Sequence, residues 1–257
     1  MFISIITINY NNADGLERTI QSVLLQENVQ IEYIIIDGGS TDDSVKIIRR
    51  FSEKISYWVS EKDRGVYDAM NKGISQANGD YLLFLNSGDF LISGHVLSKL
   101  FGGTKNGADI VYGDLKVRTN VTLNSITFPD ELPFSFVRTH SLPHPATLIK
   151  RELFQKVGLY DIKLKIAADW KFFMLALYKH NTSYFHVPEF ITEYNLDGIS
   201  SQPQNMPIIT AEKDAVMKEH FEAFREDYEN LEKFRSVYMY YTASRKVKLL
   251  RSLKLIR

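Results

Sequence analysis

The sequence predicts an α/β fold in which a Rossmann-like, mainly parallel central sheet has flanking helices and is followed by a helical C-terminal extension. Short apolar runs alternate with helical segments through the first half of the chain, a pattern typical of βαβ units. Three of these runs end in polar clusters, at the strand ends where ligands bind in such sheets. From Thr210 to Arg257 the pattern is almost wholly helical.

The elements of the first half follow from apolar spacing. Phe2–Ile8 is a β-branched run that suits a strand buried on both faces. Leu16–Leu25 has its apolar residues at helical spacing. The same criteria predict strands at Ile31–Ile36, Ile55–Val59 and Tyr81–Leu85, and helices at Ser44–Phe51 and Val66–Ala77.

The second half is less regular. Its composition predicts strands at Asp109–Leu115 and Tyr184–Tyr194, a hairpin-like segment at Asn120–Thr139, and helices at Leu148–Val157 and Asp169–His180. Asp197–Pro207 is rich in Gly, Ser, Pro and Asn, so we predict a loop there and consider it a candidate lid.

Composition excludes several classes of function. The 257 residues include no cysteine, so disulfides, thiol nucleophiles and cysteine-ligated zinc are excluded. Lys+Arg and Asp+Glu both number 31, which argues against nucleic-acid binding by bulk charge. No apolar stretch approaches the roughly 18–20 residues that span a bilayer, and the chain starts without a basic region typical of signal peptides. We therefore expect a cytoplasmic protein.

The polar clusters at the strand ends have two interpretations each. Asp89, in Asn86-Ser-Gly-Asp89, offers a carboxylate that can bind a hard cation, although these residue types also favour turns. In Asp37-Gly-Gly-Ser-Thr-Asp42, Asp37 can accept hydrogen bonds from a nucleoside, while the following residues suit a capped helix start. Arg64 can pair with a diphosphate or belong to a solvated turn.

Together these motifs resemble a family. Ile5-Ile-Thr-Ile-Asn-Tyr-Asn11, Asp37–Asp42, Asp63-Arg-Gly-Val-Tyr-Asp-Ala-Met-Asn-Lys-Gly73 and Gly79-Asp-Tyr-Leu-Leu-Phe-Leu-Asn-Ser-Gly-Asp89 are similar in order and spacing to glycosyltransferase family 2. The bacterial branch that builds exopolysaccharide, O-antigen and colanic-acid repeat units is the most similar. The resemblance spans roughly residues 1–200 and implies a GT-A fold, a nucleoside-diphosphate sugar donor, Mn²⁺ or Mg²⁺, and inversion at the anomeric carbon.

The resemblance also implies roles for individual residues. Asp89 matches the position that contacts the metal. A nucleotide site is implied at Thr7, Ile8, Asn9, Tyr10, Asp37, Gly38, Arg64, Asp68, Asn86, Ser87 and Gly88. By the same comparison, 1–115 is the nucleotide-sugar-binding half and 116–209 the acceptor-side half of a catalytic domain, with 210–257 as the extension.

Two departures from the family pattern concern the donor site. Many members have two aspartates where this chain has Asp37-Gly38, so a contact to the base is moved or lost. Asn86 and Gly88 replace carboxylates of the usual metal motif. Asp89 is then the one good protein ligand, and donor phosphates and water would complete the coordination of the cation.

The family's catalytic base comes from an acidic pair at a later helix start. Ala167-Ala-Asp-Trp170 matches it, with Asp169 in the base position, where it would take the proton of the acceptor hydroxyl. A helix N-terminus favours the ionised carboxylate, and an N-cap is the alternative role. His144, in Ser141-Leu-Pro-His-Pro145, is a candidate contact to acceptor or phosphate, or a structural histidine.

The last thirteen residues, Arg245–Arg257, hold six basic residues, six large aliphatics and no acid. Such a basic amphipathic stretch can lie on an anionic membrane surface, here the inner face of the plasma membrane. Packing on its own domain or in a homodimer is the alternative.

We therefore expect an inverting hexosyltransferase whose donor is a UDP-sugar, with a GDP-sugar as the less favoured alternative. Its acceptor would be a saccharide or a lipid-linked saccharide. One rival is a catalytically impaired nucleotide-sugar-binding protein, which the altered Asn86–Asp89 motif suggests. The other is a nucleotidyltransferase, but the segment Thr7–Asp14 lacks the Gly-rich basic signature of that class.

Overall fold

The computed structural model describes residues 2–119, 121–196 and 198–253, apart from the side chains of residues 105, 106 and 249. The chain forms two compact units, Met1–Thr210 and Ala211–Arg257. The first contains the sheet with its helices, and the second is helical.

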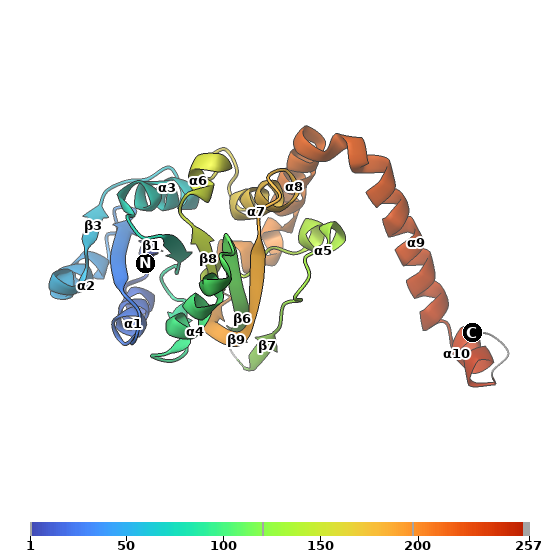
Figure 1. The fold of residues 1–257 in the computed structure, drawn as a ribbon, viewed down its shortest axis with the longest axis horizontal. Coiled ribbons are helices and arrows are strands. Elements are labelled where there is room, and N and C mark those ends of the chain that lie inside the picture. Colours follow the sequence, from blue (N-terminus) through green and yellow to red (C-terminus); the bar gives the residue numbers. More distant parts are fainter. Residues whose placement is uncertain (1, 120, 197, 254–257) are drawn as a thin grey trace. The chain divides into compact units, whose positions relative to one another are not determined.

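The described part of the first unit holds a nine-stranded sheet in the order β3-β2-β1-β4-β8-β6-β9-β5, with β7 paired to β6 (Figure 1). The strands are β1 (Ile3–Asn9), β2 (Ile31–Asp37), β3 (Tyr57–Ser60), β4 (Tyr81–Phe84), β5 (Phe90–Leu91), β6 (Ile110–Arg118), β7 (Leu123–Ile126), β8 (Thr147–Lys150) and β9 (Tyr184–Asn195). β3, β2, β1 and β4 are parallel, and β8 lies antiparallel to both β4 and β6.

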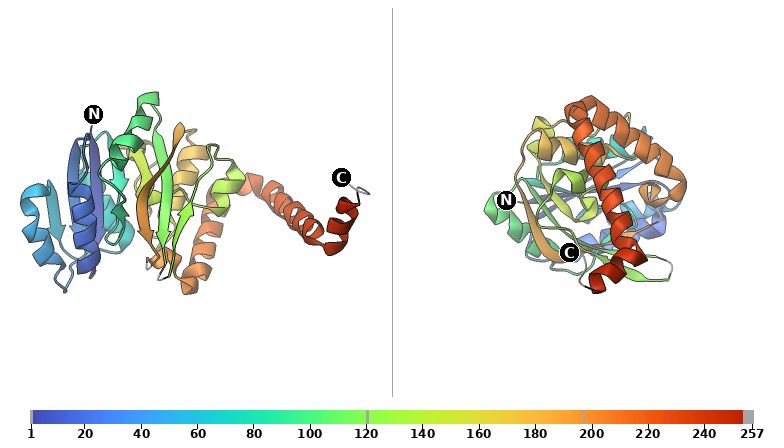
Figure 2. Two further views of the ribbon diagram at one scale, coloured as in Figure 1. Left: turned by 90° about the horizontal axis from the view of Figure 1, so that it is seen from below. Right: turned by 90° about the vertical axis from the view of Figure 1, so that its right-hand side faces the viewer.

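Helices cover both faces of the sheet (Figures 1 and 2). The helices of the first unit are α1 (Ala13–Leu24), α2 (Ser44–Arg50), α3 (Val66–Gln76), α4 (Val96–Gly102), α5 (Phe134–Thr139), α6 (Leu153–Lys156) and α7 (Ala168–Tyr178). Apolar side chains of α1, α2 and α4 form one core with the sheet. On the other face, Phe84 of β4 packs against Phe154 of α6, and Gly73 of α3 approaches Ile6 so closely that a methyl group would lie 2.4 Å from it.

The parallel register brings the predicted polar clusters together. Asn9 is paired with Asp37, and Asp37 with Ser60, so the last residues of β1, β2 and β3 stand side by side. Asn12 fixes the start of α1 behind them, because its side chain accepts a hydrogen bond from the Gly15 N–H. The sheet therefore positions its ligand-binding edge through the register of three strands.

Two predictions for the second half are wrong in part. Leu148–Val157 was predicted as one helix, but Thr147–Lys150 forms β8 and only Leu153–Lys156 is helical. The strand forms because β4 and β6 leave a position between them for an antiparallel partner, and Leu148 and Ile149 become fully buried there. Asn120–Thr139 supplies the predicted hairpin strand β7 but ends in helix α5.

The remaining elements are short helices and the second unit. Single 3₁₀ turns lie at Ser52–Lys54, Gly103–Asn106, His144–Ala146, Ile199–Ser201, Pro203–Asn205 and Glu222–Phe224. Two of them lie within the predicted loop, whose first residue, Asp197, lies outside the described residues. α8 (Met206–Phe221), α9 (Arg225–Ala243) and α10 (Arg245–Ser252) confirm the helical pattern of the extension. Of the helices that the structure describes, none has the length and apolar character of a membrane span.

Candidate functional site

A hydrogen-bonded network joins the ends of β1, β2 and β3. The Asn9 side-chain amide donates to Asp37 Oδ1 at 2.7 Å, and the Ser60 hydroxyl donates to Asp37 Oδ2 at 2.6 Å. Ser40 donates to both carboxylate oxygens, from its hydroxyl at 2.6 Å and from its backbone N–H at 2.9 Å. A carboxylate accepts about four hydrogen bonds, so Asp37 is saturated by protein groups.

Asp37 is fully buried and still held in its ionised form. Burial alone would raise the pKa of its carboxyl, but the hydrogen bonds from Ser40, Ser60 and Asn9 outweigh burial and lower that pKa below its ordinary value. Its geometry therefore makes Asp37 an organiser of the three strand ends. Its predicted contact to the nucleoside stays a prediction.

The loop after β1 presents its residues in different ways. Thr7 is fully buried, with its hydroxyl 3.1 Å from the Tyr33 hydroxyl, and Ile8 and Asn9 are also buried. A ligand can therefore meet Thr7 and Ile8 chiefly through the backbone. The side chain of Tyr10 is exposed. Asn11, at a φ of 49°, receives the Thr41 N–H on its side-chain oxygen and ties this loop to the one after β2.

Gly38 adjoins a carboxylate that the sequence patterns did not single out. A Cβ at Gly38 would lie 2.5 Å from Asp63 Oδ2 and 3.3 Å from the Tyr10 ring. Asp63 is itself oriented by the Gly65 N–H, which donates to its other oxygen at 2.9 Å. The space that an aspartate at position 38 would need is thus partly filled by Asp63, so the departure at Gly38 leaves a carboxylate at this place.

Arg64 and Asp68 form an ion pair at the start of α3. The Arg64 guanidinium donates to Asp68 Oδ1 at 2.8 Å, and the Arg64 backbone N–H donates to Asp68 Oδ2. The hydrogen bonds from Arg64 lower the pKa of Asp68. The Arg64 side chain remains largely exposed, so its other donors stay accessible to an anionic group.

The Asn86–Asp89 turn is fixed to α1 by one buried hydroxyl. The Thr19 hydroxyl donates to the Asp89 carbonyl at 2.7 Å and lies 3.0 Å from the Gly88 N–H, which donates to it. Gly88 has a φ of 103°, a conformation that favours glycine. The Asn12 side chain also donates to the Ser87 carbonyl at 3.0 Å. These contacts set the turn beside the β1 loop.

Asp89 is buried, with a residue exposure of 5%. Burial raises the pKa of its carboxyl to about 7, against the opposing effect of the Asn195 N–H, which donates to Asp89 Oδ1 at 3.1 Å. In the described part of the chain no group of three or more His, Asp or Glu residues could enclose a metal ion.

The turn nonetheless has oxygen donors that fit a hard cation. The buried side-chain oxygen of Asn86 has no hydrogen-bond partner, and it belongs to the same turn as the Asp89 carboxylate. Carboxylate and amide oxygens are ligands of Mg²⁺, Mn²⁺ and Ca²⁺. These two oxygen donors are therefore of the type that a hard cation prefers.

Asp169 lies in the first turn of α7, whose N-cap is Ala167, and it contacts a tyrosine of α3. The Tyr67 hydroxyl lies 2.8 Å from Asp169 Oδ1 and 2.5 Å from the Ile166 carbonyl. Burial, together with the Asp169 charge, raises the pKa of Tyr67 well above its ordinary value, so the phenol stays protonated. Tyr67 directly precedes Asp68, and the first turn of α3 therefore connects the Arg64–Asp68 pair with Asp169.

His144 lies in an aromatic cluster behind this site. Its ring stacks on Phe84 with centroids 4.9 Å apart, and its Nε2 is 2.9 Å from the Tyr160 hydroxyl. Burial lowers the pKa of His144, although the nearby Asp169 charge acts in the opposite direction. The imidazole is therefore neutral near pH 7 and is packed as a core residue. Its predicted contact to acceptor or phosphate stays a prediction.

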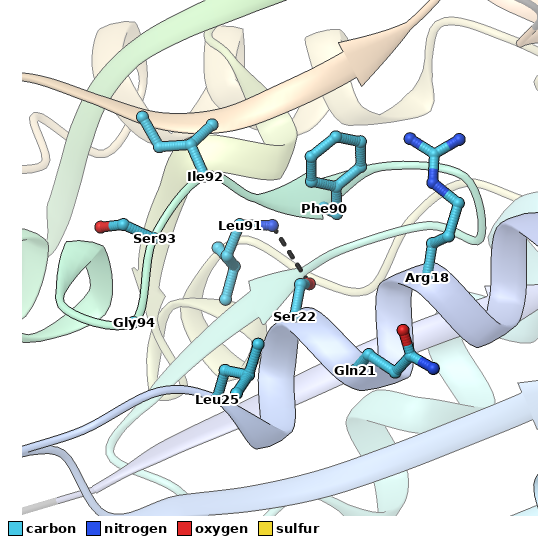
Figure 3. A pocket seen from close by; sticks show the side chains of 9 residues that line it. All are labelled: Arg18, Gln21, Ser22, Leu25, Phe90, Leu91, Ile92, Ser93 and Gly94. Atoms are coloured by element: carbon cyan, nitrogen blue, oxygen red, sulfur yellow. Dashed lines mark hydrogen bonds between the residues drawn. The ribbon is translucent and has the colours of Figure 1, made fainter.

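A hollow of about 280 Å³ lies apart from these groups, between α1 and the strand β5 (Figure 3). The Arg18 guanidinium lies over the Phe90 ring, 4.7 Å from its centroid, and the Leu91 N–H donates to the Ser22 hydroxyl at 3.1 Å. Its lining, Arg18, Gln21, Ser22, Leu25 and 90–94, includes none of the predicted site residues. The candidate site is therefore the strand-end edge.

Comparison with known proteins identifies the family of this chain and relates its fold to solved structures. The model of glycosyl transferase family 2 matches residues 4–158. An uncharacterized glycosyltransferase of Mycobacterium tuberculosis is 38% identical over 181 residues, which cover 68% of each chain. A PGL/p-HBAD biosynthesis glycosyltransferase of Mycobacterium bovis is 32% identical over 197 residues, 74% of this chain and 72% of the relative. Neither name refers to O-antigen or colanic acid.

Solved structures share the fold at low sequence identity. TarS 1–349 of S. aureus, in complex with UDP-GlcNAc, superposes with a TM-score of 0.64 at 18% identity and covers 76% of this chain. The match spans 58% of that TarS chain. The mannosyltransferase PcManGT of Pyrobaculum calidifontis, in complex with GDP-Man and Mn²⁺, has a TM-score of 0.58 at 13% identity and covers 98% of this chain and 84% of its own. The predicted GT-A-like arrangement of a mostly parallel sheet with flanking helices is confirmed.

Proposed function

Because this chain belongs to glycosyltransferase family 2, a family of inverting enzymes, we propose that it transfers a hexose from a UDP-sugar to a saccharide hydroxyl. The observation that supports this most is the position of Asp169. It stands at the start of α7, in contact with the tyrosine of the same α3 turn that holds the Arg64–Asp68 pair. The carboxylate that we propose as the base is therefore linked through one turn of α3 to an arginine whose side chain is exposed.

The proposed reaction is a single in-line displacement. Asp169 takes the proton of the acceptor hydroxyl while that oxygen attacks the anomeric carbon from the side opposite the diphosphate. The bond between the anomeric carbon and the diphosphate oxygen breaks, and the nucleoside diphosphate leaves. Attack from the opposite side inverts the anomeric configuration.

We propose that Asp89 and the side-chain oxygen of Asn86 hold Mn²⁺ or Mg²⁺ together with the donor diphosphate. A divalent cation there would offset the charge of the departing diphosphate. The cation in turn would favour the ionised form of Asp89, which burial alone disfavours. Arg64 would pair with the diphosphate from the other side of the site.

The finer assignments rest on the same family comparison. We propose that 1–115 binds the donor and that 116–209 faces the acceptor. From its composition rather than from the family, we propose that the loop Asp197–Pro207 closes over the donor. The nucleoside would contact the loop Thr7–Tyr10 and the Asp63 carboxylate beside Gly38. The acceptor would be a saccharide of a polysaccharide or of a lipid-linked precursor, as in the branch that makes exopolysaccharide and O-antigen.

The test is the variant Asp169→Asn, assayed by release of UDP from a UDP-sugar with Mn²⁺, where water or an added saccharide accepts the sugar. We expect turnover to fall by roughly a thousandfold, the typical contribution of a general base, while nucleotide affinity stays within about twofold because Asp169 faces the acceptor. Glu152→Gln, a change of an exposed carboxylate, is the control. Wild-type turnover of Asp169→Asn would reject the base assignment.

The altered metal motif at Asn86–Asp89 favours one rival, a nucleotide-sugar-binding protein without catalysis. The same assay separates the two functions when it is run with wild type, with and without Mn²⁺. Binding of a UDP-sugar without any release of UDP, to water or to an added saccharide, would support the rival. Release that depends on Mn²⁺ would support the transferase.

A further inference from the structure

The helix α9 of the second unit exposes an aromatic stripe. Phe234, Tyr238 and Tyr241 follow one another at intervals of four and three residues, which places them on one face of the helix. Their exposed fractions are 74%, 62% and 60%. Leu231 and Val237, each more than half exposed, widen this face. We call these five residues the α9 stripe.

Acidic and basic residues occupy different parts of the second unit. From Ala211 to Glu232 the sequence has eight acidic residues. From Lys233 to Leu253 it has none, and its charged residues are all cations: Lys233, Arg235, Arg245, Lys246, Lys248 and Arg251. The aromatic half of α9 and all of α10 therefore form a segment with cations and no acidic residue, and the side chains of Arg245, Lys246 and Lys248 are exposed.

We propose that the α9 stripe and the α10 cations bind the surface of a membrane that contains anionic phospholipids. Tyrosine rings place an apolar body beside the acyl region and a hydroxyl among the headgroups. Lysine and arginine side chains pair with the headgroup phosphates. The two sets occur together in the last part of this unit.

A second copy of the chain is the rival partner of this surface, because an antiparallel two-fold pair could set the cations of one copy opposite the acidic residues of 211–232 in the other. Between Lys233 and Leu253 no carboxylate offsets the cations, and an anionic lipid surface attracts a segment of this composition. Vesicle binding and oligomeric state, measured on the same variants, separate the two partners.

The experiment is sedimentation of the full chain with vesicles of phosphatidylcholine, or of phosphatidylcholine mixed with phosphatidylglycerol. We expect binding to the mixed vesicles only, and weaker binding as salt rises. Lys246→Glu, Lys248→Glu and Arg251→Glu together should weaken binding at least a hundredfold, because each cation near the surface contributes about fivefold to the affinity for anionic lipid. Phe234→Ser, Tyr238→Ser and Tyr241→Ser together should reduce binding at least tenfold.

The matched control replaces three exposed cations of the first unit, Arg49, Lys54 and Lys163, by glutamate. We expect it to bind vesicles like wild type. Circular dichroism checks that the variants keep their helices, since the changed side chains of α9 are exposed. The proposal would be overturned if both triple variants still bound the vesicles as wild type does. It would also be overturned if wild type were a dimer, the stripe variant were a monomer, and neither of these two proteins bound vesicles.

This inference is independent of the proposed reaction. Release of UDP from a UDP-sugar to water or a soluble saccharide needs no vesicle, so both triple variants should turn over the donor at the wild-type rate. A chain that binds anionic vesicles but releases no UDP in that assay would support the membrane surface and reject the transferase.

Discussion

Tyr67 gives Asp169 a fixed neighbour, which makes it a positioning residue for the proposed base. Its hydroxyl has one proton and two acceptors, the Ile166 carbonyl and Asp169 Oδ1. The contact fixes the tyrosine between the start of α7 and the carboxylate, and it limits the rotation of Asp169. A base that turns away from the acceptor hydroxyl loses much of its effect.

We predict that Tyr67→Phe lowers kcat by roughly tenfold and changes the donor KM little. The aromatic ring remains, so packing against Tyr160 is kept. Steady-state kinetics with a UDP-sugar and Mn²⁺ would measure both constants, and thermal unfolding would report the effect on stability. A variant that is less stable but has wild-type kcat would reduce Tyr67 to a structural residue.

The sequence identified some of these residues and not others, for a physical reason. Asp89 and Asp169 were predicted because each matches a short motif of the family, Asn86–Asp89 after a strand and Ala167–Trp170 at a helix start. Asp63 and Tyr67 lie within the motif Asp63–Gly73 but were given no role, and Thr19 lies outside every motif, because their roles depend on contacts across the fold. Tyr67 and Asp169 are 102 residues apart in sequence, and Thr19 and Asp89 are 70 apart. A local pattern cannot predict such a contact.

Asp37 acts at the scale of elements, since it links the ends of β1, β2 and β3. Its carboxyl has a lowered pKa, so its ionised form stabilises the folded chain. This contribution is complete above the ordinary aspartate pKa of about 4. It is lost as the pH falls from there through the lower pKa of the folded state.

We predict that Asp37→Asn reduces the free energy of unfolding by about 2 kcal/mol at pH 7, the scale of hydrogen bonds to a buried charged group. The difference from wild type should shrink below about pH 4, where wild-type Asp37 becomes protonated as well. Urea unfolding at pH 7 and at pH 3 would measure it. Asp43→Asn, at an exposed position, is the control, and an equal difference at both pH values would contradict the prediction.

Element prediction succeeded where a segment's own pattern decides its structure. From β1 to β4 the strands and helices were predicted to within a few residues, because buried parallel strands and amphipathic helices have distinct apolar spacing. The next two elements, β5 and α4, were not predicted. β8 was missed because its residues also suit a helix. Pairing on both sides, with β4 and β6, decides its conformation, and no local pattern reports that pairing.

At the scale of the whole molecule, a donor that binds only the folded first unit should raise its stability. At a hundred times its Kd, a ligand adds about 2.7 kcal/mol, which corresponds to roughly 5–10 °C in Tm for a domain of this size. We predict such a shift with a UDP-sugar and Mn²⁺, and a smaller one with a GDP-sugar, measured by thermal unfolding.

The cation should account for part of this shift, because the protein offers Asp89 as its one carboxylate in the Asn86–Asp89 turn and the diphosphate must supply further ligands. Mn²⁺ alone should therefore change Tm little. Asp89→Asn should lose the increment that Mn²⁺ adds to the UDP-sugar and keep the increment of the UDP-sugar alone. An equal shift of wild type with Mn²⁺ and with a chelator would show that the donor binds without the cation, and Asp89 would then have no role as a metal ligand.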